Sequence, residues 1–459
     1  MKTKLYFAMV AAIVALSSTV SAQIENNLKL SGELQTDQRL LLNDDKDWAW
    51  NELRLTLNLD KQISSVYKFH SELWLRNIGE PSVVTSGDLF NKPFVDPYNL
   101  EIRDAFVQAN GFLLNNLDLI IGRQQIVWGT ADRLNPTNNL NPHDLEDILD
   151  FGRKRGSDAV SFQYYFKNGY SVQGVFIPSF QPANMPVGLF ANVLNPSIDM
   201  PQGMVLKSIS DTLIMPKNSL KESSAAGFRV KGFARGIDFS LSYAWCYDGL
   251  PYSSSNILSP VDVMGGTHIY SHLSFIRNHI VGADFVTSIA GAGLWAEAAA
   301  FMPENDIVMT TDLSAFFPAS PVPVTQDSVL LKKNKPYLKY VIGGDYFFPD
   351  GSYLNFQYLH GFIHERGNKA LNDYFFLRYE KNLFNDKIKC VPIGGGFIVT
   401  DWKNIEKNYA IVYMPEIVYK VNPNTELSLA CSFFDGKGQN LFAGLNKYDM
   451  VMFKMKYSF

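Results

Sequence analysis

The chain has 459 residues, of which 46% are hydrophobic, 14% are aromatic and only 19% are charged. A disordered or coiled-coil protein would carry more charge and fewer aromatic residues, so this composition excludes both classes. With 41 basic and 45 acidic residues the net charge is −4, which gives the chain no electrostatic reason to bind nucleic acid.

The first 22 residues have the features of a cleaved secretion signal. Lys2 and Lys4 precede an apolar run over residues 5–16, and Val20-Ser21-Ala22 provides small residues at the −3 and −1 positions of a cleavage site. We therefore expect cleavage before Gln23 and export of residues 23–459 as a single domain. No cysteine follows the cleavage point, which argues against a lipid anchor.

Alternation of apolar and polar residues with a period of two dominates the rest of the chain. Every second residue from Leu53 to Leu59 is leucine, and residues 160–166 and 237–247 repeat the alternation. A period of two is the signature of β-strands with one apolar face. Segments of about ten to fifteen residues are longer than most strands of soluble proteins and are long enough to cross a bilayer at a tilt.

Short and long connections alternate between these segments, as in outer-membrane barrels, which have short periplasmic turns and long outer loops. Short turns rich in Gly, Asn, Asp or Pro are expected near residues 60–62, 111–115, 167–169, 234–236, 290–292, 349–351, 384–386 and 421–424. Longer connections are expected over residues 77–97, 128–156, 181–222, 248–267, 303–335, 363–371 and 435–446.

This alternation predicts an all-β fold, a transmembrane antiparallel up-and-down barrel of about 18 strands. The count assumes that His268 to Ser288 form one long strand, and 16 strands is the alternative. Helical spacing is limited to the stretch from His143 to Asp150, which predicts a short helix in the loop after the fifth strand.

The C-terminal segment resembles the last strand of Gram-negative outer-membrane proteins. Its apolar face consists of Val451, Phe453, Met455, Tyr457 and the terminal Phe459. The resemblance implies that the barrel-assembly machinery recognises Phe459. It also implies a location in the Gram-negative outer membrane, with lipid around the barrel.

A closed barrel of 16 to 18 strands encloses an aqueous channel unless something fills it. The loop after the fifth strand carries both signs of charge and, folded inward, would set a size limit and a transverse field. The candidates for a pore constriction are Arg123, Asp132, Arg133, Asp144, Arg153 and Arg155. The alternative is an ordinary folded outer loop, in which Asn-Pro pairs start turns and Arg123 forms a salt bridge with Asp132.

Other charged residues lie on the polar faces of predicted strands. A charge that points into lipid costs about 2–4 kcal/mol at the bilayer midplane, so these side chains should face the lumen. The candidates for the lumen wall are Arg54, Glu72, Arg103, Arg229 and Arg378.

One segment carries a family resemblance. Gly122-Arg123-Gln124 is followed by Trp128-Gly129 and by the pairs Asn135-Pro136 and Asn141-Pro142. This segment resembles a porin-like family of outer-membrane barrels and, more distantly, the alginate-export and phosphate-selective barrels. The resemblance implies a transport barrel and specifies no substrate.

The sequence therefore favours a porin-like channel for passive or weakly selective passage of small solutes, constricted by residues 128–156. The alternative is a channel for hydrophobic or lipid-like solutes capped by the 181–222 loop, which contains Met185, Leu189 and Phe190. A barrel enzyme and an assembly or adhesion protein rank below both. Against the enzyme, no nucleophile motif such as Gly-x-Ser-x-Gly occurs. We expect no catalytic residues, metal or cofactor. The sequence leaves open whether the protein forms a homo-oligomer.

Overall fold

A computed structural model describes residues 28–43, 46–79, 81–191, 193–194, 200, 203–262 and 264–459. The predicted signal segment lies outside the described residues. Among the described residues, no helix has both the length and the apolar character needed to cross a membrane.

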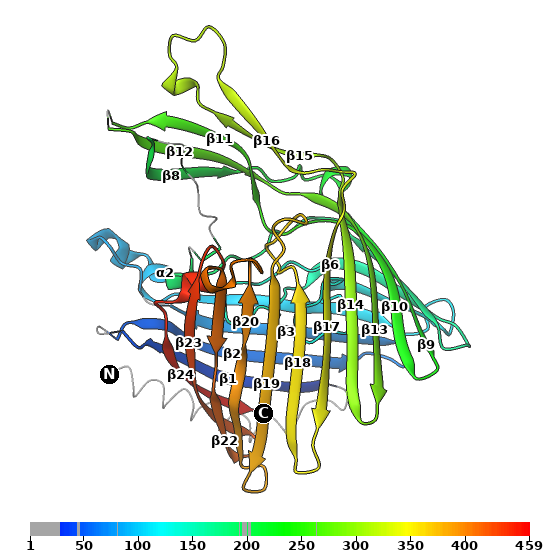
Figure 1. The fold of residues 1–459 in the computed structure, drawn as a ribbon. Coiled ribbons are helices and arrows are strands. Elements are labelled where there is room, and N and C mark those ends of the chain that lie inside the picture. Colours follow the sequence, from blue (N-terminus) through cyan, green and yellow to red (C-terminus); the bar gives the residue numbers. More distant parts are fainter. Residues whose placement is uncertain are drawn as a thin grey trace.

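In the described part of the chain, 18 antiparallel strands form a closed barrel (Figure 1). In chain order the wall consists of β1 (Leu28–Leu41), β2 (Trp48–Gln62), β3 (Tyr67–Ile78), β4 (Tyr98–Ala109), β5 (Leu117–Gln124), β6 (Ser157–Tyr165), β7 (Ser171–Ile177), β9 (Ala225–Ala234), β10 (Ile237–Tyr247), β13 (Arg277–Ile289), β14 (Ala292–Pro303), β17 (Tyr337–Phe347), β18 (Ser352–His360), β19 (Asp373–Leu383), β20 (Ile388–Val399), β21 (Tyr409–Tyr413) with β22 (Glu416–Asn422), β23 (Thr425–Lys437) and β24 (Met450–Ser458). Segments β21 and β22 form one interrupted strand, because β20 and β23 each pair with both. Pairing of β1 with β24 closes the sheet, so the predicted barrel is confirmed.

The two ends of the barrel differ in their connections. One end carries eight short turns between the described strands, and the other carries nine longer connections. β1 begins and β24 ends at the turn end, since Leu28 pairs with Lys61 and Tyr457 pairs with Thr425. The predicted alternation of connection lengths is therefore confirmed.

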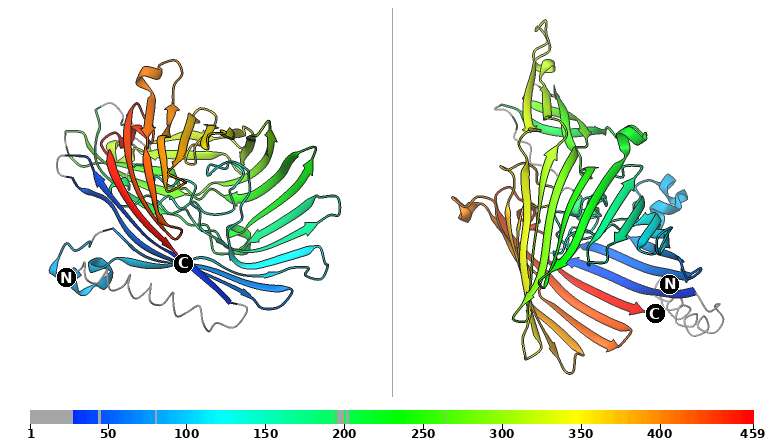
Figure 2. Two further views of the ribbon diagram at one scale, coloured as in Figure 1. Left: turned by 90° about the horizontal axis from the view of Figure 1, so that it is seen from below. Right: turned by 90° about the vertical axis from the view of Figure 1, so that its right-hand side faces the viewer.

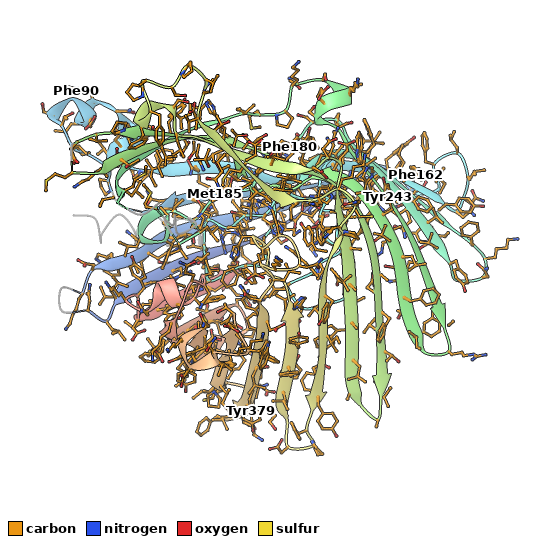
Figure 3. The ribbon with its side chains drawn as sticks, turned by 45° about the horizontal axis from the view of Figure 1, so that its top comes forward. Phe90, Phe162, Phe180, Met185, Tyr243 and Tyr379 are labelled. Atoms are coloured by element: carbon orange, nitrogen blue, oxygen red, sulfur yellow. The ribbon has the colours of Figure 1, made fainter. Side chains whose placement is uncertain are left out.

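The wall has an apolar outer face and a polar inner face. Leu55 pairs with Leu34 on the outside, whereas the neighbouring Arg54 donates a hydrogen bond of 2.9 Å to Gln35 on the inside. The rings of Phe162 and Tyr243 also project from the outer face, where each is more than one third exposed (Figure 3). Such an outer surface suits lipid better than water.

Three of the long connections contribute to a second sheet beyond the barrel, which we call the outer sheet (Figures 1 and 2). It contains β8 (Val205–Leu213), β11 (Tyr252–Pro260), β12 (Gly266–Ser274), β15 (Ile307–Asp312) and β16 (Thr325–Leu331), in the order β16-β15-β11-β12-β8. The described helices are single turns in connections: η1 (Ser86–Phe90), α2 (Lys92–Val95), η2 (Gly188–Phe190), α3 (Leu220–Ser223), η3 (Ser314–Phe316), η4 (Ile405–Lys407) and η5 (Ala443–Leu445).

The structure corrects two predictions. The stretch from His268 to Ser288 is not one strand, because the consecutive buried residues Phe275 and Ile276 interrupt its alternation and the chain passes from β12 of the outer sheet into β13 of the wall. The count of 18 still holds because β12 lies outside the barrel. Residues 143–150 contain turns and isolated bridges rather than a helix, because their carboxylates bind the barrel wall.

Candidate functional site

The connection between β5 and β6, residues 125–156, folds into the barrel, and we call it the inner loop. In the left view of Figure 2, which looks into the barrel from the turn end, this part of the chain lies within the ring of strands. The inner loop bonds to inward-facing side chains of β1, β3, β4, β7 and β14. It therefore crosses the space that an open barrel would leave to water.

Buried ion pairs fasten the inner loop to the wall formed by β1, β3 and β4. Three wall arginines each donate to one loop carboxylate: Arg39 to Asp147 (2.8 Å), Arg76 to Glu146 (2.6 Å) and Arg103 to Asp144 (2.8 Å). Arg153 of the loop also pairs with Asp144, at 2.9 Å. Burial alone would raise the pKa of Asp144, but the positive charges of Arg153 and Arg103 outweigh it and hold that pKa below its usual value.

An aromatic ring lies among these arginines. The guanidinium groups of Arg54 and Arg103 lie 4.3 and 4.1 Å from the ring centroid of Trp74 on β3, within cation–π distance. Arg76 and Arg153 lie 5.6 and 5.8 Å from the same ring. Wall and loop arginines thus share one aromatic contact, and the loop carboxylates neutralise much of their charge.

On the opposite wall a single carboxylate holds the loop. Glu297 of β14 is 2% exposed and accepts five hydrogen bonds from residues 130–137. The shortest, both 2.7 Å, come from the backbone N–H and the hydroxyl of Thr137. Because a buried carboxylate needs every one of its acceptor positions satisfied, this contact specifies the path of the loop.

The residues of the family-like segment mainly build the loop. Trp128 is 1% exposed and donates to Gln173 of β7 at 2.8 Å, while Gly129 adopts a φ of +92° beside Glu297. The amide of Asn141 accepts from the Ile126 N–H at 2.6 Å and donates to the carbonyl oxygen of Arg155 at 2.9 Å. Asn141 thereby joins the two ends of the loop. This structural role is sufficient to explain an Asn at this position.

Five of the six constriction candidates belong to the inner loop and have different surroundings. Asp132, Arg133 and Arg153 line a cavity at the turn end, and Asp144 is fully buried among arginines. Arg155 donates to the carbonyl oxygen of Pro182 at 2.5 Å and so joins the inner loop to the next connection.

Arg123 does not belong to this group. It lies on the outer face of β5, two residues from the exposed Ile121, and its guanidinium pairs with Asp158 at 2.9 Å rather than with Asp132. The prediction that Arg123 lines the constriction is therefore wrong. Neighbouring residues of a strand point to opposite faces, and Gln124 takes the inward position, where it bonds to Ser161 of β6 at 2.6 Å.

The proposed lumen-wall residues do face inward. Arg54, Glu72 and Arg103 surround Trp74, and Arg229 donates to the Val127 carbonyl oxygen of the inner loop at 3.3 Å. Arg378 lines the turn-end cavity and lies 3.5 Å from Glu416. Sequence reasoning missed Arg39, Arg76 and Glu297 as site residues, although Arg76 shares the polar parity of Glu72 on β3.

The described residues line two cavities on opposite sides of the inner loop, and both contain Arg133 and Leu134. The turn-end cavity has a volume of about 720 Å³, and its charged lining residues are seven Arg or Lys and six Asp or Glu. The loop-end cavity has a volume of about 90 Å³ and lies among the ends of the wall strands that carry long connections. The backbone at Arg133 has a φ of +67°, a left-handed turn at the boundary between the cavities.

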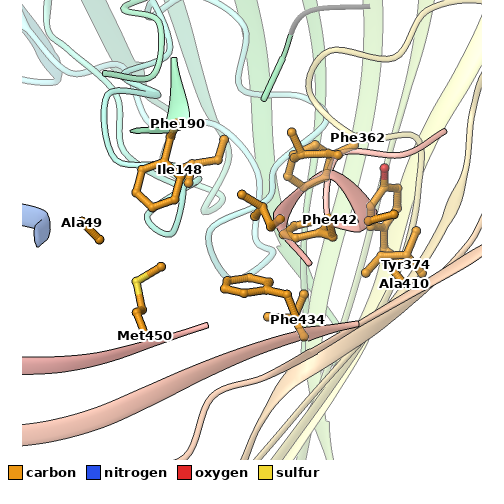
Figure 4. Close-up of a cluster of buried hydrophobic side chains, with 14 of the residues drawn as sticks. Ala49, Ile148, Phe190, Phe362, Tyr374, Ala410, Phe434, Phe442 and Met450 are labelled. Atoms are coloured by element: carbon orange, nitrogen blue, oxygen red, sulfur yellow. The ribbon is translucent and has the colours of Figure 1, made fainter. Parts of the chain in front are cut away.

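Apolar side chains fill much of the barrel beside the inner loop (Figure 4). Ile148 of the loop, Phe190 of the next connection, Phe362 and Phe442 pack with inward residues of the wall such as Tyr374. Phe190 is 0% exposed. We call this group the apolar cluster, and it brings four separate connections together inside the barrel mouth.

The described residues include no group of three or more His, Cys, Asp or Glu side chains placed to hold a metal ion.

Residues 95–373 match the sequence profile of a family described as "Protein of unknown function (DUF1302)". None of the curated proteins compared with this sequence matches it. Among solved structures, OccK9 (OpdG) of Pseudomonas aeruginosa is similar at 10% identity and a TM-score of 0.48, covering 94% of this chain and 97% of that one. OmpF of Salmonella typhi in complex with daunomycin has 10% identity and a TM-score of 0.40, with coverages of 94% and 98%. OprB of Pseudomonas putida has 10% identity and a TM-score of 0.39, with coverages of 94% and 94%.

Proposed function

This chain belongs to the DUF1302 family, and for it we propose a function as an outer-membrane channel for small solutes in which the inner loop controls passage. The apolar outer face of the closed wall supports residence in a lipid bilayer, since every wall strand finds hydrogen-bond partners on both sides. A secretion signal at residues 1–22 and the terminal Phe459 would direct such a barrel to the Gram-negative outer membrane.

The observation that carries the proposal is the position of Arg133 and Leu134. Both residues line the turn-end cavity and the loop-end cavity, so this short stretch of the inner loop separates them. A solute that passes from one cavity to the other must displace or pass these side chains. The turn-end cavity has nearly balanced charge, which is consistent with weak selectivity at that end.

Single-channel conductance in planar bilayers tests this proposal. Deleting the whole loop is a poor test, because it would also remove the loop carboxylates from Arg39, Arg76 and Arg103 and leave these arginines with only their wall partners. Glu297→Gln is sharper, since an amide offers one acceptor oxygen where the carboxylate accepts five hydrogen bonds. We expect the variant to show larger or more frequent openings than the wild type.

Asp345→Asn is the matched control, because Asp345 is a carboxylate of β17 near the turn end that accepts a hydrogen bond from Tyr353 and not from the loop. It should conduct like the wild type. A folded wild type and a folded Glu297→Gln variant that both fail to conduct would contradict the channel proposal.

A second candidate, passage of hydrophobic solutes, is favoured by the apolar cluster. Phe190 inserts from the 178–224 connection into the barrel mouth and contacts Tyr448 edge to face, with ring centroids 5.9 Å apart. An apolar solute could replace these contacts at no large desolvation cost, whereas a hydrated solute could not. Uptake of a fluorescent fatty acid into proteoliposomes, compared with a sugar of similar size, would separate the two candidates.

A further inference from the structure

The loop-end cavity has an unusual charge environment for its depth. It lies on the long-connection side of the inner loop, and two lysines line it, Lys154 from the inner loop and Lys339 from β17. The Lys154 ammonium donates to the Asn138 carbonyl oxygen, and that of Lys339 donates to the carbonyl oxygens of Phe362 (2.6 Å) and Ile363 (3.1 Å). Neither ammonium forms an ion pair with a carboxylate of the described residues.

Two of the other charged groups around the cavity, Asp248 and Arg133, are already in ion pairs. Asp248 accepts from the guanidinium Nε of Arg366 at 2.7 Å, and Arg133 lies 3.7 Å from Asp150. Glu365, which lies behind the lining, accepts from the Phe362 N–H and from the side chain of Asn372. The charge of Glu365 offsets one of the two lysines, because its hydrogen-bond donors are all neutral, and one positive charge is left without a counter-charge in the cavity.

Two further polar groups of the lining lack partners. Asn278 of β13 is 1% exposed and its Oδ1 has no hydrogen bond, and Nδ1 of His143 is likewise buried and unbonded. Burial holds the pKa of His143 well below its usual value and lowers that of Lys154 to about 7. Buried polar groups without partners cost stability. A bound carboxylate would accept a hydrogen bond from His143 in the tautomer that carries hydrogen on Nδ1, whereas the Asn278 oxygen needs a donor such as water.

Apolar side chains form part of the remaining lining, beside polar ones such as Asn139, Ser157 and Gln181. Phe180, which is labelled in Figure 3, Phe301 and Phe362 contribute rings, and Leu140 and Ile177 contribute aliphatic surface. These side chains disfavour a small, strongly hydrated ion as the occupant and favour a molecule with an apolar part.

We propose that the loop-end cavity is a binding site for a small monocarboxylate, with the carboxylate between Lys154 and Lys339 and the apolar part against the aromatic rings. The proposal rests on the channel function above and deepens it by naming the class of solute. A monocarboxylate supplies the single missing negative charge, and its short apolar chain suits a cavity of about 90 Å³.

Isothermal titration calorimetry on the refolded protein in detergent tests the site with butyrate, 1-butanol and butylammonium, which share an apolar chain and differ in head charge. We expect butyrate to bind at least tenfold more tightly than 1-butanol, and butylammonium to give no detectable heat. In the Lys154→Met/Lys339→Met double variant the preference for butyrate over 1-butanol should disappear.

Lys335→Met is the matched control, because Lys335 is an exposed lysine in the turn just before β17, outside the lining. It should bind butyrate like the wild type. Equal affinities of the wild type for butyrate and 1-butanol would overturn the proposal, as would an unchanged preference in a folded double variant. If the double variant does not fold, binding of the three probes to the wild type still tests the proposed site.

The binding experiment in detergent and the conductance experiment in bilayers test the two proposals separately. A barrel that binds butyrate without conducting would refute the channel proposal alone. A conducting barrel without a preference for butyrate would refute only the monocarboxylate site.

Discussion

A β-carbon added to Gly129 of the inner loop would lie 2.3 Å from Oε2 of Glu297 on β14. Gly129 also has a φ of +92°, which L-residues rarely adopt. A glycine at this position is what lets the buried carboxylate approach the loop backbone closely enough to accept hydrogen bonds from residues 130–137.

Gly129→Ala should therefore release the inner loop from β14. The added methyl group collides with the carboxylate, and the left-handed backbone adds a strain of about 1–2 kcal/mol. We expect faster tryptic cleavage after Arg133 and Arg153 in the refolded barrel, measured by mass spectrometry. Gly188→Ala is the control, since Gly188 has a φ of +62° but no atom within 4 Å of an added β-carbon.

Substitutions of Arg39 and Asp147 should have strongly non-additive effects on the free energy of unfolding. Arg39→Met leaves the Asp147 carboxylate buried without its main partner, and loss of one member of such a pair costs about 3–5 kcal/mol. Asp37 would keep a partner in Lys454, at 2.9 Å. Replacing both members, as in Arg39→Met/Asp147→Leu, should restore at least half of the lost free energy of unfolding in urea titrations. Simply additive effects of the two substitutions would contradict the pairing.

Lys154 should make the barrel's stability depend on pH. Burial lowers its pKa to about 7 in the folded state, whereas an unfolded lysine titrates near about 10.4. Between these values the unfolded chain binds more protons, so stability should rise from pH 7 toward pH 10. Below pH 7 both states are protonated and the full penalty remains. Lys154→Met should flatten this rise when unfolding is measured across that range.

Phe190 should control the attachment of the 178–224 connection to the barrel. Removing a fully buried phenyl ring costs about 3–5 kcal/mol. Because Phe190 belongs to a connection and not to a wall strand, we expect this cost to lower the free energy of local opening of the connection rather than the stability of the wall. Phe190→Ala should speed amide hydrogen exchange in residues 181–191. Leu189→Ala, at a neighbouring position that is 40% exposed, should have little effect.

Much of the wall could be predicted because strand alternation is a local property. A residue's face follows from its parity, so the sequence predicts inward positions for Arg54, Glu72 and Arg378, which lie beside Gln35, beside Trp74 and in the lining of the turn-end cavity, respectively. The same parity places Arg123 outside, because its neighbour Gln124 takes the inward position. The strand from His268 to Ser288 was wrong, since two adjacent buried residues mark the place where the chain leaves the wall.

The sequence by itself determined the closed barrel, its strand number and the end at which the long connections lie, because period-two patterning and turn residues act over a few positions. Only the tertiary structure decided that residues 125–156 lie inside the barrel, that Glu297 holds them, and that Lys154 and Lys339 line one cavity without an ion pair to a carboxylate of the described residues. Those relationships join residues far apart in the chain. They depend on which inward-facing side chains the closed wall brings opposite one another, and no local pattern encodes that.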